Sequence, residues 1–392
     1  MKKSFLGILT LITLMLTVIV YINDNIKVTE VNYNLPKTNF YSHRFGKVVG
    51  IFTMPLNDTE DILILSLDKE NDRSIIYSLN ILDGSSSEIM KFSTHENIKD
   101  KVCFDEFGEY IMAPNKNGIV ATNINLLLQG NESSVVTRTY PEFQYADNFH
   151  ATRGEITYTT NNNNLIYNGN IFRQDFNESY YLNKYYKKPE KLFFKTTSSN
   201  EIYYTKINKG HKNLYMFKPN DFRGNILDKE IVENFVHGYI TDLYSGIVYG
   251  LREENGRLTA FLEENLHSRE IIDLCTIPMN DDSLGQVPDI FVRQDHERIK
   301  SIYTSFDKNG LGSIFLKSSI EDNPEVIVKD EFIVGKLSYI DYKEENEHSD
   351  GNRSIEMILY TSIENGELKI KLVDINDKSI KDITGLFGEV SI

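Results

Sequence analysis

The sequence is short of positive charge. It contains 42 lysines and arginines against 57 aspartates and glutamates, which gives a formal net charge of −15. A protein that binds nucleic acid needs a basic face to neutralise phosphates, so this charge balance argues against a nucleic-acid partner. The same deficit argues against a domain that lies flat on an anionic membrane surface. We therefore expect no nucleic-acid partner for this chain.

Cysteine is also scarce. Cys103 and Cys275 stand far apart, each in apolar surroundings, in a chain of 392 residues. Two distant cysteines in a large domain do not make the disulfide framework that holds small secreted proteins together. We expect two buried free thiols, which pack as small hydrophobic side chains. A single disulfide between them is the alternative outside the cytoplasm.

The common sequence motifs of catalysis are missing. The chain contains no Gly-x-Ser-x-Gly elbow, no phosphate-binding glycine-rich loop and no His-Glu-x-x-His pair. No two of its eight histidines stand at the spacing of metal ligands: His43, His95, His150, His211, His237, His267, His296 and His348. The sequence thus predicts no catalytic, cofactor-binding or metal site, and no cofactor.

Tryptophan is absent, but other aromatic residues are frequent, with 23 tyrosines and 22 phenylalanines. Aromatic and β-branched residues favour half-buried strands, so this composition leans towards β-sheet. The hydrophobic fraction of 40% is enough for a sizeable core. The length suits two average domains or one large repetitive domain.

A long hydrophobic run lies near the N-terminus. Two lysines precede an uncharged stretch from Ser4 to Asn23, and residues 5–22 are its apolar part. At about 1.5 Å per residue, these residues span about 27 Å of helix, close to the hydrocarbon thickness of a bilayer. The lysines orient the N-terminus inward. We expect a cytoplasmic tip at 1–4, a transmembrane signal anchor at 5–22, a stalk at 23–37 and an extracytoplasmic domain at 38–392.

Other interpretations of this run fit less well. A cleaved signal peptide needs small residues before the cut, whereas the run ends Val18-Ile19-Val20-Tyr21-Ile22. A lipoprotein needs a cysteine directly after the run, and the first is Cys103. A buried core helix would show a polar face. An uncleaved single-pass anchor in the cell membrane fits best, and cleavage at a divergent site stays open.

The rest of the chain repeats one pattern. Each unit has a short apolar strand, a polar turn that usually carries Asn or Gly, and a second apolar strand. One large residue in each first strand marks the units: Leu65, Tyr110, Tyr158, Tyr204, Tyr249, Tyr303 and Tyr360. Successive markers are 45, 48, 46, 45, 54 and 57 residues apart. A strand–turn–strand unit with this period is typical of the blades of a β-propeller.

One unit carries a more specific resemblance. Residues 302–315 run Ile-Tyr-Thr-Ser, then a polar turn with Asn309-Gly310, then Ile314-Phe315. This order resembles the hairpin of TolB-like and WD-related propeller repeats, and the units that begin at Ile202 and Ile358 match nearly as well. The resemblance covers residues 45–385 and implies a fold rather than a function. The absence of tryptophan excludes the tryptophan-rich repeat of propellers that bind quinone cofactors.

The expected fold class is therefore all-β, a β-propeller preceded by one N-terminal transmembrane helix. Seven units predict seven blades, and six or eight stay open because two early turns lack glycine. A pair of β-sandwiches or a solenoid is the alternative. We expect the strand around residues 47–53 to close the ring by completing the C-terminal blade. Polar insertions at 279–286 and 343–353 are expected to be surface loops.

A carbohydrate-active enzyme on this fold would need two carboxylates at one pocket. Asp105, Asp242 and Asp289, near the ends of predicted strands, are the nearest candidates, and none is assigned a catalytic role. His150 and His237 are the histidines that could be turned towards a channel. The oxygen-rich run 280–283 lacks the regular alternation of ligands in a calcium loop.

A tyrosine-rich stretch is the remaining candidate for binding. Tyr180, Tyr181, Tyr185 and Tyr186 stand among lysines. Exposed tyrosines offer large, rigid, amphipathic surfaces that suit sugars or peptides. The other interpretation is an outer strand whose tyrosines pack between blades.

These features predict a non-enzymatic binding or scaffold protein at the outer face of a bacterial cell membrane. Its partners are the membrane, through the N-terminal helix, and a protein or cell-envelope component at the propeller face. The alternative is an extracytoplasmic carbohydrate-active hydrolase or lyase with carboxylates in the channel. A sensor subunit of a membrane complex differs from the first hypothesis mainly in its partner. Carboxylates that converge at one channel mouth would favour the enzyme.

Overall fold

A computed structural model describes most of the chain after residue 38. The described ranges are 39–53, 60–68, 72–95, 102–104, 110–124, 126, 135–152, 155–161, 165–168, 179–181, 191–195, 202–208, 210–220, 225–240, 248–263, 271–277, 288–295, 298–344 and 353–391. The expected tip, transmembrane anchor and stalk lie outside them. Within them, no helix is both long and apolar enough to span a bilayer. The chain divides into two units after Tyr33, and all described residues belong to the second.

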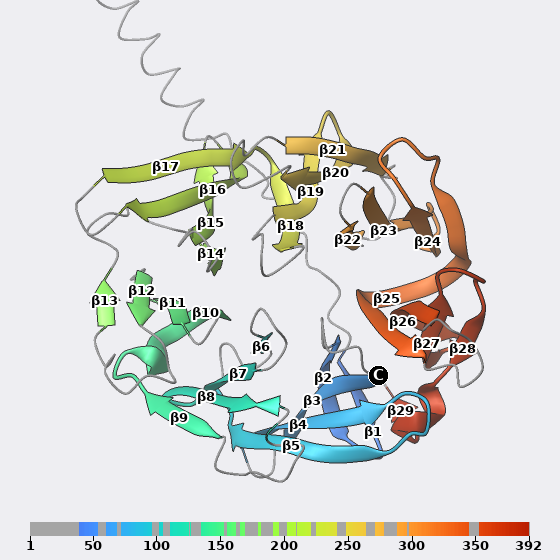
Figure 1. Cartoon of the computed structure of the whole chain (residues 1–392), viewed down its shortest axis with the longest axis horizontal. Helices are drawn as coiled ribbons and strands as arrows, with labels where there is room; N and C mark the ends of the chain where they lie inside the picture. Colours follow the sequence, from blue (N-terminus) through green and yellow to red (C-terminus); the bar gives the residue numbers. More distant parts are fainter. Residues whose placement is uncertain are drawn as a thin grey trace, which may run out of the picture. The chain divides into compact units, whose positions relative to one another are not determined.

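The described residues are mainly β-strand, arranged as antiparallel sheets whose strands follow chain order apart from β29, which lies beside β1 (Figure 1). Sheet 1 contains β1 (Phe40–Ser42), β2 (Gly46–Thr53), β3 (Asp61–Asp68), β4 (Arg73–Asn80), β5 (Ser86–Ser93) and β29 (Val390–Ser391). Sheet 2 contains β6 (Cys103–Phe104), β7 (Tyr110–Asn115), β8 (Gly118–Asn123) and β9 (Val136–Thr139). Sheet 3 contains β10 (Ala146–Thr152), β11 (Glu155–Thr160), β12 (Leu165–Asn168) and β13 (Ser179–Tyr181).

The later sheets repeat this arrangement. Sheet 4 contains β14 (Lys191–Lys195), β15 (Ile202–Asn208), β16 (His211–Asn220) and β17 (Asn225–Val232). Sheet 5 contains β18 (Phe235–Ile240), β19 (Val248–Glu254), β20 (Arg257–Glu263) and β21 (Ile271–Ile277). Sheet 6 contains β22 (Ile290–Asp295), β23 (Arg298–Phe306), β24 (Gly312–Lys317) and the first part of β25 (Glu325–Glu344). Sheet 7 contains the rest of β25, β26 (Arg353–Glu364), β27 (Glu367–Asp374) and β28 (Ile380–Asp382).

Two short 3₁₀ helices complete the described elements. One, Phe143–Tyr145, precedes β10, and the other, Thr384–Phe387, precedes β29. The long strand β25 serves two sheets, because residues 325–331 pair with β24 and residues 332–344 pair with β26. It therefore links the outer strand of one sheet to the first strand of the next without a loop.

The seven predicted repeat units are confirmed as hairpins, formed by the second and third strands of sheets 2 to 7 and by β3 and β4 in sheet 1. Each forms an antiparallel hairpin: β3–β4, β7–β8, β11–β12, β15–β16, β19–β20, β23–β24 and β26–β27. The turn residues adopt the positive φ angles that tight hairpins require, with Asn255 at 52° and Gly256 at 72°. Asn365 and Gly366 repeat this pair at 52° and 83°.

The hydrophobic core is divided among the contacts between neighbouring sheets, which we call seams. Sheets 1 and 2 share a cluster around Leu65 and Ile111, and sheets 2 and 3 share one around Met112 and Tyr158. Equivalent clusters join sheets 4 and 5, sheets 6 and 7, and sheets 7 and 1. Strand β10 contacts β14, and β19 contacts β22, so the two other seams are also in contact. Each sheet therefore packs on the next and the last packs on the first, which is the order of blades in a propeller.

The closure of this cycle differs from the prediction. Residues 47–53 do form a strand, but β2 pairs with β3 in the N-terminal sheet and completes no C-terminal blade. Instead, the C-terminal β29 adds to sheet 1 through β1, with Tyr41 opposite Ser391. The C-terminal sheet already has four strands of its own, so its four-stranded unit is complete without β2.

Candidate functional site

Asp289 is the one predicted carboxylate candidate whose surroundings are described. It immediately precedes β22 and is buried, with 4% of its surface exposed. Its Oδ1 accepts a hydrogen bond of 2.8 Å from the Tyr239 hydroxyl in sheet 5. Its Oδ2 accepts one of 2.8 Å from the Leu337 amide in sheet 7. The Asp289 amide donates to Thr304 Oγ1 at 2.7 Å within sheet 6. This residue therefore ties three consecutive sheets together.

His237 lies beside this carboxylate, in β18. Its Nε2 is 2.8 Å from the carbonyl oxygen of Pro288, so it also joins sheet 5 to the segment that leads into sheet 6. Burial lowers the pKa of His237 below its usual value, and the nearby Asp289 carboxylate only partly opposes this effect. His237 is thus packed between sheets, not turned towards an open channel.

Two tyrosines complete the surroundings of Asp289. Burial and the Asp289 charge together raise the pKa of Tyr239 far above its ordinary value, and they act on Tyr249 in the same direction. Both phenols are therefore protonated at neutral pH and serve as donors or packing surfaces. The Lys336 ammonium lies 5.1 Å from the centre of the Tyr239 ring, where the ring face attracts a cation.

Alternate residues of β22 and β25 face each other along the seam between sheets 6 and 7. Asp289 meets the Leu337 amide, and two residues further on the rings of Phe291 and Tyr339 stack with centroids 4.6 Å apart and planes 9° apart. Two residues beyond that, Arg293 Nη1 lies 2.5 Å from Asp341 Oδ2. This spacing of two follows from the alternation of side chains along a strand.

The far end of this seam gathers two basic and two acidic side chains. Arg293 and Lys300 lie opposite each other on β22 and β23, and Asp341 and Glu356 lie opposite each other on β25 and β26. Lys300 Nζ is 2.6 Å from Glu356 Oε2, and Arg293 Nη1 is 3.8 Å from Glu356 Oε1. A basic pair in sheet 6 thus meets an acidic pair in sheet 7, and the four formal charges cancel.

Tyr339 belongs to this charged group. Its hydroxyl donates to Glu356 Oε1 and lies 2.6 Å from Arg293 Nη1. Burial and the neighbouring Glu356 raise the pKa of Tyr339 well above its usual range. The arrangement brings two carboxylates, two cations and a phenol together, all partly buried. No motif in the sequence marked these residues, although the alternation Phe291-x-Arg293 and Tyr339-x-Asp341 places them on shared strand faces.

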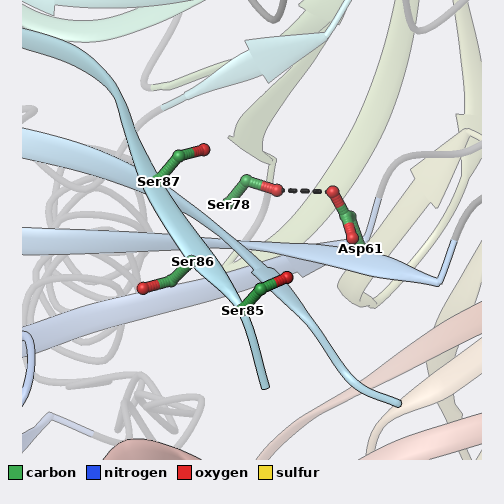
Figure 2. Close-up of a pocket in the computed structure, with 5 residues that line it drawn as sticks. All are labelled: Asp61, Ser78, Ser85, Ser86 and Ser87. Atoms are coloured by element: carbon green, nitrogen blue, oxygen red, sulfur yellow. Dashed lines mark hydrogen bonds between the residues drawn. The ribbon is translucent and has the colours of Figure 1, made fainter. Parts of the chain in front are cut away.

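A polar pocket of about 170 Å³ opens on sheet 1. It is lined by Asp61 at the start of β3, Ser78 near the end of β4, and Ser85, Ser86 and Ser87 at the start of β5. Figure 2 shows the hydrogen bond from Ser78 to Asp61, with Ser85, Ser86 and Ser87 following one another on the neighbouring strand. Asp61 Oδ2 accepts a hydrogen bond of 2.7 Å from Ser78, and its Oδ1 accepts one of 2.9 Å from the side-chain amide of Asn80.

Hydrogen bonds from the turn between β1 and β2 hold the exposed rim of this pocket. Arg44, in the turn between β1 and β2, donates from Nη2 to Ser86 Oγ and to the Gly84 carbonyl, both at 2.8 Å. Ser78 is buried, whereas the three serines of the rim are exposed. The pocket therefore offers hydroxyl and carboxylate oxygens to a polar ligand from solvent.

Other predicted site residues are not brought together in the described part of the chain. Asp105, Asp242 and residues 280–283 lie outside it. So do Tyr185 and Tyr186, whereas the backbone of Tyr180 and Tyr181 forms β13. The backbone of His150 lies in β10, and His211 is exposed at the start of β16. Among the described residues no three His, Cys, Asp or Glu side chains are grouped as metal ligands.

Neither cysteine forms a disulfide, and both are partly rather than fully buried, which differs from the predicted full burial. Cys103 lies in β6 and Cys275 in β21. Burial raises the pKa of the Cys275 thiol to about 11, although the Lys317 charge and a hydrogen bond with Tyr303 act in the opposite direction. A thiol with so high a pKa is mostly protonated at neutral pH and reacts slowly.

Comparison with solved structures supports a propeller-like fold. The chain is similar to an uncharacterised protein from Listeria monocytogenes EGD-e (TM-score 0.53, 12% identity, 90% of this chain and 97% of that one). It is also similar to an oligogalacturonate lyase from Vibrio parahaemolyticus (TM-score 0.54, 10% identity, 89% and 93%). The β-propeller domain of the Trilobed protease from Pyrococcus furiosus, described as having an open velcro topology, matches as well (TM-score 0.50, 12% identity, 88% and 98%).

No family model matches the sequence, and no curated protein does. At these levels of identity the similar structures show a shared fold and nothing about chemistry. Some of them are enzymes by their descriptions and one is uncharacterised. The all-β, propeller-like fold class predicted from the repeat is therefore confirmed at this level.

Proposed function

We propose that this protein is a membrane-anchored, extracytoplasmic β-propeller of seven blades that binds a protein or cell-envelope partner without catalysing a reaction. The described part of the chain supports the blade number, because it contains six groups of four strands and one group of six. The TolB-like and WD-related hairpin pattern agrees with this architecture. The anchor rests on the sequence, where an uninterrupted apolar run of bilayer length follows two lysines.

The observation that carries the binding hypothesis is that both carboxylate oxygens of Asp289 accept hydrogen bonds within the protein. A catalytic carboxylate needs an oxygen that can reach a substrate. Both oxygens of Asp289 are instead held by Tyr239 and Leu337, in two different sheets, and the residue is buried. This arrangement supports a structural role, in which a fixed inner frame carries surface loops that contact a partner.

The pocket on sheet 1 is where we expect the partner to bind. Asp61 accepts hydrogen bonds from Ser78 and Asn80, which hold its carboxylate at the wall of the pocket. This carboxylate and the exposed hydroxyls of Ser85 and Ser87 suit a ligand with several hydroxyl or amide groups. Sugars and peptides of the cell envelope have this chemistry.

The test is site-specific photocrosslinking with the full-length chain in intact cells. A photoreactive residue at Ser87, on the rim of the pocket, is compared with one at Lys308, which is exposed in the turn between β23 and β24. We expect a defined adduct from position 87 that is weaker after Asp61→Ala and absent from position 308. Equal labelling from both positions, or none from position 87, contradicts binding at this pocket.

An extracytoplasmic carbohydrate-active hydrolase or lyase is the second candidate, and the cluster of Arg293, Lys300, Asp341 and Glu356 favours it. Two carboxylates on facing positions of β25 and β26 meet the minimum requirement of such an enzyme. Each is paired with a cation, however, which suits a tie between sheets equally well. Release of reducing ends from envelope or plant polysaccharides by the purified protein, lost in Asp341→Asn but kept in Glu367→Gln, would support the enzyme over the binding protein.

A further inference from the structure

His237 combines burial with one unpartnered ring nitrogen. It is 6% exposed, and its Nε2 lies 2.8 Å from the Pro288 carbonyl oxygen. A carbonyl oxygen only accepts, so Nε2 carries the proton and the neutral ring has a lone pair on Nδ1. Nδ1 is buried, and no group in the described part of the chain hydrogen-bonds to it.

Protonation of the His237 ring would add a buried charge and a buried hydrogen-bond donor. A second proton on Nδ1 would place a positive charge and a donor without an acceptor inside the contact between sheets 5 and 6. The charged groups around the ring do not compensate for this. Asp289 attracts the cation, but its oxygens already accept from Tyr239 and Leu337, while Lys336 from β25 and Lys212 from β16 repel it. The phenols of Tyr239 and Tyr249 are neutral.

The contacts between sheets 5 and 6 involve His237 and residues close to it. His237 meets the Pro288 carbonyl, Tyr239 meets Asp289, and the ring of Tyr249 packs edge-on against Phe291 with centroids 6.4 Å apart. The imidazolium can gain hydration only if the strands on either side move apart. Because the His237 and Tyr239 contacts are two residues apart on one strand, loss of the first weakens the second.

We propose that His237 is an acid-sensitive latch between sheets 5 and 6, closed when its ring is neutral and opened when the ring is protonated. The direction of the lowered pKa agrees with this assignment, since the open form binds the proton more tightly than the closed form. Closure is complete above the ordinary histidine pKa of about 6.5. It weakens by about tenfold for each pH unit below that value until the pKa of the closed form is reached. The latch would make binding by the extracytoplasmic domain dependent on acidity.

The test is hydrogen exchange of the full-length protein at pH 7.5 and pH 5.0, corrected for the intrinsic pH dependence of exchange. In the unmodified protein we expect peptides that cover β18 and β22 to lose protection about tenfold or more at pH 5.0 relative to peptides from β26 and β27. In His237→Gln this relative loss should vanish, because the glutamine amide can donate to the Pro288 carbonyl and does not titrate.

Two controls separate this latch from general acid sensitivity. His211→Gln removes an exposed histidine and should behave as the unmodified protein. His95 is also buried, with Nε2 at 3.0 Å from the Phe143 carbonyl oxygen. It is present in every variant, so any acid effect of His95 is the same in all of them and cancels in the comparison. The same acid-dependent loss in His237→Gln, or an equal loss in all sheets, overturns the proposal.

A second measurement keeps the test valid if His237→Gln fails to fold. The chain has no tryptophan, so Phe291→Trp introduces a single fluorescent reporter on the sheet 6 side of the seam. We expect its emission to shift to longer wavelength between pH 7.5 and pH 5.0 at denaturant concentrations well below unfolding. An emission maximum that does not change over this range overturns the latch.

Discussion

Asp341 and Glu356 lie directly opposite each other on the paired strands β25 and β26, so two carboxylates share one face of sheet 7. Like charges in this position destabilise a sheet on its own. The next sheet supplies the reason for their presence, because Arg293 and Lys300 form an equivalent basic pair and meet the carboxylates across the seam. The two pairs therefore complement each other in charge across the seam.

This arrangement predicts that removing a cation whose carboxylate partner is partly buried costs more stability than removing one whose partner is exposed. Lys300→Met should lower the free energy of unfolding by about 1–3 kcal/mol, because Glu356 is then left partly buried with a weaker partner. Urea unfolding followed by circular dichroism measures the change. Lys369→Met is the matched control, because its partner Glu367 is 74% exposed whereas Glu356 is 15% exposed, and the loss of stability should be clearly smaller.

A double-mutant cycle of Lys300→Met and Glu356→Gln separates the effect of charge pairing from that of packing. In a cycle with Glu356→Gln, the double variant should be destabilised by less than the sum of the two single variants, because the second change removes a charge that the first left unpaired. Additive effects would show that Lys300 and Glu356 are not coupled.

Glycine at positions 238 and 250 is required by a close approach of two strands. Gly238 lies opposite Gly250, and a Cβ on Gly250 would fall 2.2 Å from the His237 carbonyl oxygen. Gly250→Ala should therefore destabilise the protein by about 2–4 kcal/mol, since backbone atoms must move. Thermal unfolding monitored by circular dichroism measures this effect.

The matched control for that variant is a glycine with free space around it. Gly256 has φ of +72° and nothing within 4 Å of the position that a Cβ would take, so Gly256→Ala carries only the conformational strain, roughly 1 kcal/mol. Equal losses in both variants would contradict the close approach of β18 and β19 as the cause.

Ring closure depends on Phe387, which is fully buried between Phe40 and Phe45 with ring centroids 5.9 and 5.7 Å away. Phe387→Ala should cost about 3–5 kcal/mol because it leaves a cavity where the two ends of the domain meet. Hydrogen exchange should rise first in β1 and β29, whose pairing is only two residues long. Phe332→Ala, at a side chain that is 48% exposed, should change stability by less than about 0.5 kcal/mol. The prediction is wrong if both phenylalanines behave alike.

The raised pKa of the Cys275 thiol, about 11, predicts slow alkylation at ordinary pH. The reactive thiolate is the minor form until the pH approaches this value, so at pH 8 iodoacetamide should modify Cys275 roughly 100-fold more slowly than an ordinary cysteine. The rate should continue to rise by about tenfold per pH unit beyond pH 9, where an ordinary thiol has levelled off. Mass spectrometry of the peptide that contains Cys275 measures the rate, with the urea-unfolded chain as reference. Equal rates in the folded and unfolded chain would show that the thiol is exposed.

The hairpins could be predicted from the sequence because everything that forms them is local. The apolar strands of β19 and β20 and the Asn255-Gly256 turn between them lie within 16 residues, and the turn residues alone determine the reversal. All seven hairpins are predictable in this way. Ring closure is not, because β2 pairs with β3 at the N-terminal end of the chain and was predicted to complete the C-terminal blade. That choice depends on whether sheet 7 already has four strands, which no local pattern reveals.

The candidate site was only partly predictable. Asp289 could be singled out as a carboxylate near a strand end, but its role as a tie between three sheets follows from Tyr239 and Leu337, each about 50 residues away along the chain. Arg293 and Asp341 could not be identified from the sequence, because neither belongs to a motif. Their meeting requires two sheets to pack with residues 291 and 339 in register.

By itself, the sequence determined that this is an acidic, all-β protein built from a repeated hairpin, and it predicted a hydrophobic anchor ahead of that domain. These properties follow from composition, period and turn chemistry, which act over a few residues. The tertiary structure decided how the cycle of sheets closes, and that Asp289 and His237 are buried ties between blades. Those outcomes depend on contacts between strands far apart in the chain, where packing and the exclusion of water determine which polar groups must satisfy one another.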